Sequence, residues 1–149
     1  MENRFEKFTN LVLKTGKIIQ RIKNIEMEEY GLKAVHVMCI YHLSKSPEGL
    51  TNKELVTLTY EDKGAISRAL DLLKEKDIIS SEPKKYNGII TLTEYGYKVA
   101  EYICERSDKA LEKSGVGVSD QERIALYATL TKIEENIEEY YSELLKKDM

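Results

Sequence analysis

Four residues near the start of one predicted helix have the chemistry to contact nucleic-acid bases. They are Lys63, Gly64, Ser67 and Arg68. Arginine can donate two parallel hydrogen bonds to guanine, and serine can bond several base or phosphate acceptors. Glycine lets the backbone approach a base or a phosphate closely, although it costs about 1 kcal/mol of helix propensity relative to alanine. A solvated helix face with an incidental glycine is the alternative, and these four residues alone leave both interpretations open.

The helix that presents them is predicted to begin after Asp62, an N-cap residue. Its apolar side chains fall on the opposite arc and are Ala65, Ile66, Ala69, Leu70, Leu72 and Leu73. A short helix precedes it, because Thr51 and Glu54 have the spacing of a capping box. A short helix, a tight turn and a longer helix are typical of a helix-turn-helix. The start of the short helix therefore adds three candidate DNA contacts, Thr51, Asn52 and Lys53.

A β-hairpin is predicted directly after the helix-turn-helix. Asn87 and Gly88 are the strongest short hairpin signal, because both tolerate the positive φ of a type I′ turn. Apolar residues lie on both sides of this turn, at Ile78, Ile79, Ile89, Ile90 and Leu92. A hairpin in this place is a wing, and it moves the interpretation of the first four residues toward DNA. The wing tip adds further candidate DNA contacts, Lys84, Lys85, Tyr86 and Asn87.

Long amphipathic helices are predicted at both ends of the chain, over about 3–29 and about 120–145. The last one begins at a capping box formed by Ser119 and Glu122. Its apolar residues step by three and four, as in a coiled coil, and are Leu126, Leu130, Ile133, Ile137, Tyr140 and Leu144. Two apolar stripes of this length exceed what one small core can cover, so we expect a homodimer.

The expected fold is mainly α, a winged helix-turn-helix with long N- and C-terminal dimerisation helices and a small β-hairpin wing. Residues 1–30 and 114–149 are the expected dimerisation helices. Residues 31–113 are the expected DNA-binding region, with helices over about 32–45 and after Thr93, the second of which connects the two regions.

Composition fits one globular domain or compact subunit of 149 residues. The formal net charge is −3, but residues 51–98 hold eight Lys/Arg and eight Asp/Glu and so net zero. Charge therefore neither supports nor excludes DNA. The charged N-terminus does not resemble a signal peptide and no stretch is apolar enough to span a membrane, so we expect a cytoplasmic protein without membrane contact. Cys39 and Cys104 are too few for a disulfide framework.

The order of these elements resembles the MarR-type winged-helix transcription regulators. The resemblance rests on "LTNKELVTLTYEDKGAISRALDLLKEKDII", a hairpin, and then "TLTEYG", which is similar to the family's Leu-Thr-x-x-Gly segment. "LKAVHVMCIYHL" resembles the family's second helix. The resemblance implies a homodimer on a pseudo-palindromic operator in double-stranded DNA. It also implies repression that is usually relieved by a small-molecule effector or by oxidation.

Two positions depart from the family pattern. The family wing usually carries Asp-x-Arg at its tip, with the arginine in the minor groove, whereas this chain has "EPKKYNG" without arginine. The family usually has glycine where this chain has Asp77, and aspartate tolerates the left-handed conformation better than most residues. The missing arginine and the net-neutral segment favour the rival hypothesis, a winged-helix protein–protein adaptor that no longer binds DNA, whereas "KGAISR" and the two lysines at the wing tip argue against it.

The remaining chemical groups suggest an effector pocket at most. Tyr30, His36, Tyr41 and Tyr102 are candidate pocket residues, with ordinary half-buried packing as the simpler explanation. His36, Cys39 and His42 step by three along one helix, but a buried cysteine usually packs as a small hydrophobe, so we expect no metal site. No group of residues resembles a catalytic site, and we expect neither enzyme activity nor a cofactor.

Overall fold

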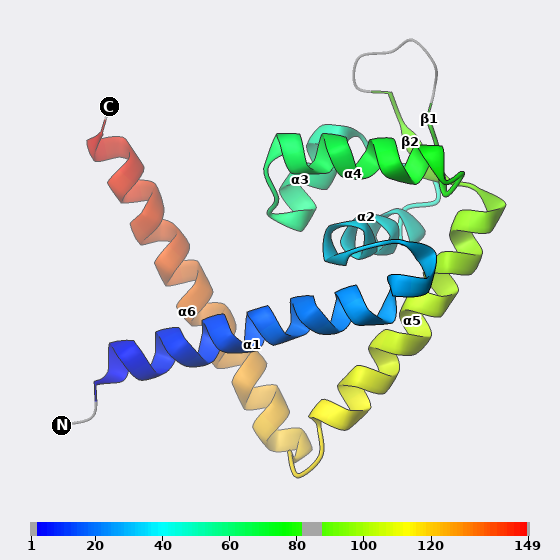
Figure 1. The fold of residues 1–149 in the computed structure, drawn as a ribbon. Coiled ribbons are helices and arrows are strands. Elements are labelled where there is room, and N and C mark those ends of the chain that lie inside the picture. The colour runs from blue at the N-terminus through cyan, green and yellow to red at the C-terminus, as the bar shows by residue number, and fades with distance from the viewer. Residues whose placement is uncertain (1–2, 82–87, 149) are drawn as a thin grey trace. The chain divides into compact units, whose positions relative to one another are not determined.

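The computed structural model describes residues 3–81 and 88–148 and divides the chain into two compact units, 1–108 and 109–149. The elements of the first unit are α1 (Arg4–Glu26), the 3-10 turn η1 (Glu28–Tyr30), α2 (Ala34–Ser44), α3 (Asn52–Thr59), α4 (Lys63–Glu75), β1 (Ile79–Ser81) and β2 (Ile90–Leu92) (Figure 1). The boundary between the units falls within α5 (Glu94–Ser114), and the second unit continues with α6 (Asp120–Lys147). The predicted winged-helix fold class is confirmed.

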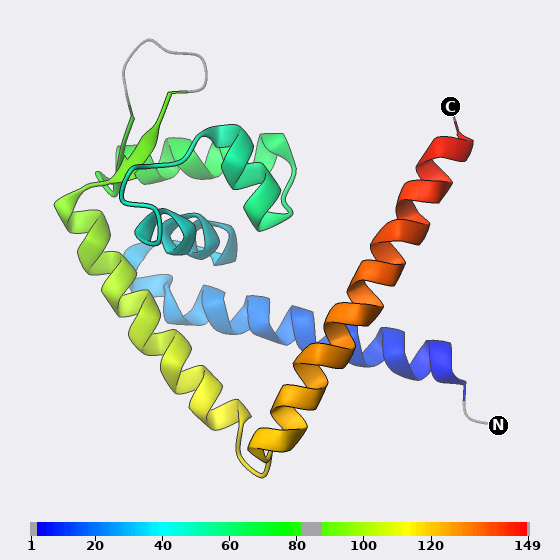
Figure 2. The same cartoon turned by 180° about the vertical axis from the view of Figure 1, so that it is seen from behind.

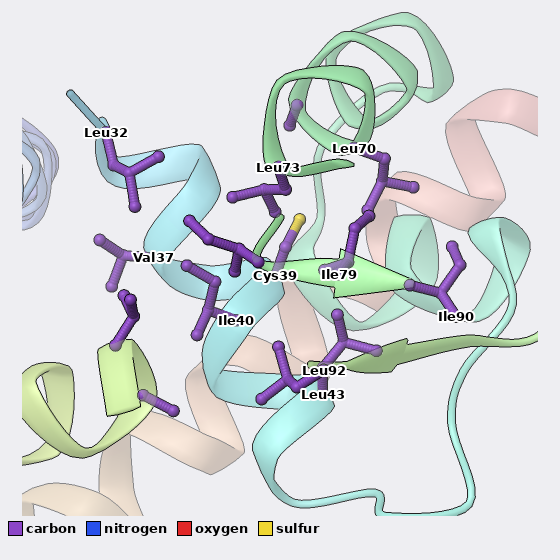
Figure 3. Close-up of a cluster of buried hydrophobic side chains, with 14 of the residues drawn as sticks. Leu32, Val37, Cys39, Ile40, Leu43, Leu70, Leu73, Ile79, Ile90 and Leu92 are labelled. Carbon is purple, nitrogen blue, oxygen red and sulfur yellow. The ribbon is translucent and has the colours of Figure 1, made fainter. Parts of the chain in front are cut away.

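The core of the first unit is built around α2, which contacts α1, α3, α4 and β2. In both views α2 lies between α4 and α1 (Figures 1 and 2). Figure 3 shows Leu43 of α2 beside Leu92 of the hairpin, and the same buried cluster also holds Ile40, Leu70, Leu73, Ile79 and Ile90. Burying a side chain of this size contributes about 1.5–3 kcal/mol. This core fixes α4 on its apolar side and leaves its other side open.

Three of the predicted helix caps are confirmed. The Asp62 carboxylate accepts a hydrogen bond from the Ala65 N–H at 2.7 Å and starts α4. Thr51 Oγ1 accepts one from the Glu54 N–H at 3.1 Å and starts α3, which is one half of the capping box predicted there. Ser119 and Glu122 form both halves of the capping box that starts α6. Each of these caps satisfies backbone N–H groups that the helix leaves free.

The first helix is shorter than predicted, because it ends at Glu26 and not at Glu29. The chain turns there so that Met27 enters the core at 2% exposure. The same end of α1 also binds other elements: the side-chain oxygen of Asn24 accepts from the Ala34 N–H at 2.8 Å, and the Tyr102 hydroxyl donates to the Glu26 carbonyl at 3.2 Å. These tertiary hydrogen bonds favour the end of α1 at Glu26 over its continuation to Glu29. The periodicity of apolar residues in the sequence cannot predict them.

The predicted hairpin is confirmed as an antiparallel pair in which Ile79 faces Leu92 and Ser81 faces Ile90. Leu50 extends the pairing through a bridge to Ile90, with hydrogen bonds of 3.0 and 2.8 Å. Asn87, the first residue of the expected turn, lies outside the described residues. An uninterrupted ladder from a two-residue turn at Asn87 and Gly88 would set Ser81 opposite Glu94, so the observed register is a different one.

The end of α4 is joined tightly to the start of α5. Asp77 has a left-handed φ of +59°, as its tolerance of this conformation predicts. Thr93 Oγ1 donates to the Asp77 carbonyl at 2.6 Å and accepts from the Gly96 N–H at 3.0 Å, so it caps α5 as predicted. A Cβ at Gly96 would lie 2.1 Å from the Ile78 carbonyl oxygen, which explains why glycine is needed there.

The predicted coiled-coil face of α6 lies open on the chain. Its exposed members are Leu126, Leu130, Ile137, Tyr140 and Leu144. The N-terminal part of α1 is similar, with exposed Phe5, Leu11, Val12 and Ile18. The homodimer that these faces predict stays a prediction, as does the assignment of 1–30 and 114–149 to dimerisation. Within residues 3–81 and 88–148 no helix is long and apolar enough to cross a membrane.

Candidate nucleic-acid interface

The polar residues of α4 are presented as the sequence predicts. Ile66, Leu70 and Leu73 are buried on one side of the helix. Lys63, Gly64, Ser67 and Arg68 are all exposed. Because a helix repeats about every 3.6 residues, these four residues lie on the side of α4 that faces away from the core. The first two turns of α4 therefore offer two cations, a hydroxyl and a bare backbone segment to a partner.

Gly64 makes room for the side chain of Arg68. A Cβ at Gly64 would lie 3.2 Å from the Arg68 guanidinium nitrogen Nη1 and 3.3 Å from an Asp62 carboxylate oxygen. The guanidinium thus rests against the glycine backbone, beside the cap of the helix. The sequence suggested that glycine serves the approach of a ligand, and the structure adds that any larger residue here would crowd the Arg68 guanidinium.

The three candidates at the start of α3 differ in availability. Thr51 and Asn52 are half-buried, and Lys53 is exposed. Thr51 Oγ1 accepts the Glu54 N–H, and its hydroxyl proton can donate to a phosphate. Lys84, Lys85, Tyr86 and Asn87 of the wing lie outside the described residues, and their part in DNA binding stays a prediction.

Two residues that the sequence analysis did not single out stand out in the structure. Tyr60, in the turn before α4, is 85% exposed and has a positive φ. Lys23 of α1 donates to Met38 Sδ at 3.1 Å, and burial lowers the pKa of its ammonium group. Lys23 could have been found, because it follows Ile19 by four in the apolar register of α1. The backbone of Tyr60 could not, because neither glycine nor asparagine marks the turn.

Two of the four candidate pocket residues meet. The ring centroids of Tyr30 and Tyr102 lie 5.1 Å apart at 58°. The Arg106 guanidinium lies 5.0 Å over the Tyr102 ring and 3.4 Å from the Glu26 carboxylate. Tyr102 lines a hollow of about 380 Å³ with Ile25, Glu26, Glu28 and Glu29. This hollow combines an aromatic ring with several carboxylates.

The other two candidates lie elsewhere. Tyr41 packs edge-on against His42, with ring centroids 5.5 Å apart, and Lys45 lies over its ring. His36 is 8% exposed, and its Nδ1 accepts the Lys33 N–H at 2.8 Å. Burial, with the positive charges of Lys33 and Lys76, lowers the pKa of His36. His36 thus closes the start of α2, and an effector role for any of the four stays a prediction.

The surroundings of the cysteine and the histidines of α2 fit a role in packing. Cys39 is fully buried, and burial together with the charge of Glu61 raises the pKa of its thiol to about 12. Such a thiol is protonated at neutral pH and reacts slowly. Among the described residues, no cluster of three or more His, Cys, Asp or Glu side chains is placed to hold a metal ion.

Solved structures of similar fold cover nearly the whole chain. A MarR transcriptional regulator from Methanosarcina mazei Go1 superposes with a TM-score of 0.79 at 18% identity, over 91% of this chain and 91% of that one. The S. aureus MepR–DNA complex gives a TM-score of 0.79 at 18% identity, over 87% and 97% of the two chains. Staphylococcus aureus MarR in complex with salicylate and kanamycin gives 0.77 at 18% identity, over 90% and 92%.

This chain has the MarR-type winged-helix fold. No model of a known protein family matches its sequence, and no curated protein does either. The chain therefore adopts the MarR-type fold although its sequence differs from these solved structures at about four aligned positions in five.

Proposed function

We propose that the chain is a sequence-specific, double-stranded-DNA-binding transcription regulator. It acts in the cytoplasm as a homodimeric repressor on a pseudo-palindromic operator. The observation that carries this proposal is the start of α4, where Lys63, Gly64, Ser67 and Arg68 are exposed opposite a buried apolar face. In a helix-turn-helix this end of the second helix contacts base edges in the major groove. The S. aureus MepR–DNA complex, a structure of the same fold, supports a role in DNA binding.

A homodimer fits both the exposed face of α6 and the symmetry of such operators. A two-fold protein presents two recognition helices to half-sites about 34 Å apart, one turn of the duplex. One copy has a mass of 17.2 kDa, so we expect about 34 kDa by sedimentation at micromolar concentration. A species of 17.2 kDa that binds DNA unchanged would contradict the dimer.

The test of DNA binding is a gel-shift with the duplex upstream of the chain's own gene. Binding should persist in excess scrambled competitor and weaken steeply with salt, because phosphate contacts release counterions. Equal loss to specific and scrambled competitors would remove sequence specificity from the proposal. If no duplex is bound, that result favours the rival function, a winged-helix protein–protein adaptor. The neutral charge of residues 51–98 fits this rival.

We also propose that a small-molecule effector relieves repression by binding in the first unit, beside the Tyr30–Tyr102 pair. The hollow lined by Tyr102 and the aromatic contact support this location. An effector acts only if it binds the DNA-incompetent conformation more tightly than the competent one. Tyr102→Phe removes the hydroxyl that donates to the Glu26 carbonyl and should weaken induction while DNA binding remains. Unchanged induction by an active compound would exclude this location.

A further inference from the structure

Tyr60 ends α3 in the turn before α4, in a backbone conformation that is common at helix ends but that its own bulky side chain does not favour. Its φ and ψ are 58° and 22°, in the left-handed region. A bulky L-residue is strained there, whereas glycine, or asparagine to a lesser degree, is not. Its side chain is 85% exposed, so packing within the chain offsets little of this strain. Strained backbone of this kind concentrates at binding sites.

The turn holds Tyr60 in a defined position. The Tyr60 N–H donates to the Val56 carbonyl at 3.2 Å. Thr59 Oγ1 donates to the Leu55 carbonyl at 2.7 Å and accepts from the Glu61 N–H at 3.4 Å. These bonds, together with the Asp62 cap, fix the backbone of the turn relative to α4. Figures 1 and 2 show that the turn lies at the end of α4 opposite to the hairpin.

This end of α4 is the one that approaches DNA in a helix-turn-helix, where the first helix crosses the phosphate backbone and the second enters the groove. A turn between the two lies beside the backbone strand that borders the bases being read. Tyrosine is a common phosphate donor in protein–DNA complexes. Glu61 and Asp62 follow Tyr60, and they disfavour phosphate by charge. The Asp62 carboxylate is bound to the Ala65 N–H, and the phenol is the longest side chain of the turn.

We propose that the Tyr60 hydroxyl donates a hydrogen bond to a DNA phosphate next to the base pairs that α4 contacts. The inference rests on the proposed DNA-binding function and assigns to the turn a contact that the charges of the chain do not indicate. Because the phenol is neutral, it neutralises no phosphate and releases no counterion. Its role is to anchor the turn to the phosphate backbone, a contact that carries no sequence information.

The test compares Tyr60→Phe and Tyr60→Gly with the unaltered chain. Both are titrated at three salt concentrations against the duplex upstream of the gene and against a random-sequence duplex. Removal of a hydrogen bond to a charged acceptor should weaken binding about tenfold for each bond. The weakening should be similar on both duplexes, with an unchanged salt slope. Tyr60→Gly should bind as weakly as Tyr60→Phe while its unfolding midpoint stays the same or rises.

Two controls separate the hydroxyl from other effects. Tyr97→Phe removes a phenol from another exposed tyrosine and should leave DNA binding unchanged. Asp77→Gly relieves the other left-handed residue that is not glycine among those described, and should also leave binding unchanged. If Tyr60→Phe binds like the unaltered chain, or if it lowers the salt slope, the proposed phosphate contact is wrong. If the unaltered chain binds neither duplex, the proposed function itself fails, which is a different result.

Discussion

The helices α4 and α6 carry the same kind of sequence pattern but differ in the exposure of their apolar residues. Each has an apolar stripe along one side. In α4 the stripe is buried against α2 and α3, and the exposed residues are polar. In α6 no residue is buried, and Leu126, Ile137 and Tyr140 are more than half exposed. An apolar stripe therefore predicts that a surface will be covered, but not whether the same chain covers it.

The largest expected effect is on the free energy of unfolding, and its dependence on protein concentration should distinguish the apolar stripe of α4 from that of α6. Leu73→Ala in α4 should lower the free energy of unfolding by about 2–5 kcal/mol, because it leaves a cavity in a closed core. Leu130→Ala in α6 should have an effect that depends on protein concentration, because its proposed partner is a second copy. Urea unfolding at two concentrations measures both. An effect of Leu130→Ala that is independent of concentration would place its contacts within one chain.

A charge on the stripe of α6 tests the same contrast at the level of assembly. Ile137→Glu should convert the expected species of about 34 kDa to one of 17.2 kDa at micromolar concentration, because an unpaired carboxylate would be buried at the seam. The helix content should remain. The matched control is Lys132→Glu, which adds the same side chain on the other side of the helix and should leave the mass unchanged. Two variants of equal mass would exclude the stripe as the interface.

On α4 the polar side should carry the reading of sequence. Arg68→Ala is expected to weaken operator binding by roughly 1–3 kcal/mol and to reduce discrimination at one base pair in each half-site. It should cost less on random DNA. Lys74→Ala is the control, because this exposed residue lies in the last turn of the same helix. Titration on operator and scrambled duplexes measures the ratio, and a ratio unchanged by Arg68→Ala would move base reading away from α4.

The wing lysine should behave differently from Arg68. Lys84→Ala is expected to weaken operator and random DNA by similar factors, because a phosphate contact carries no sequence information. The slope of binding against salt should fall by about one for each phosphate that the variant no longer neutralises. Titration of both duplexes at three salt concentrations measures the slope and the ratio. Collapse of the operator-to-random ratio in this variant would give the wing the role assigned to α4.

The smallest expected effect concerns the end of α4. Asp77→Gly should raise the free energy of unfolding by up to about 1 kcal/mol, because the left-handed conformation costs an L-residue roughly 1–2 kcal/mol and glycine returns part of that as chain entropy. Thermal unfolding measures the change. Asp77→Ala is the counterpart, since alanine keeps the strain and lacks the polar side chain, and it should be less stable than the original.

Local features of the fold could be predicted from the sequence, and long-range ones could not. Asp62, Thr93 and Ser119 were found because a cap is decided by residues three apart. The end of α1 was missed because the Asn24–Ala34 and Tyr102–Glu26 bonds join segments that the sequence keeps apart. The turn at Tyr60 was missed because its conformation is imposed by the helices on both sides.

The candidate site divides in the same way. The buried arc of α4 fixed which polar residues face outward, and their place at the start of the helix then selected Lys63, Gly64, Ser67 and Arg68. The tyrosines were grouped by composition, and the structure pairs Tyr30 with Tyr102 only. His36 was grouped with them, although its ring nitrogen is engaged at the start of α2. Composition cannot distinguish these cases, because side-chain contacts between distant segments leave no period.

The bond from Thr93 to Asp77, and the absence of a side chain at Gly96, have a mechanical consequence. Together they hold the last turn of α4, the base of the hairpin and the first turn of α5 in one rigid arrangement. The Thr93–Asp77 bond thus joins the residue that follows the end of α4 to the residue that precedes α5. Within the first unit, a rotation of the first turn of α5 is therefore expected to move the end of α4 with it.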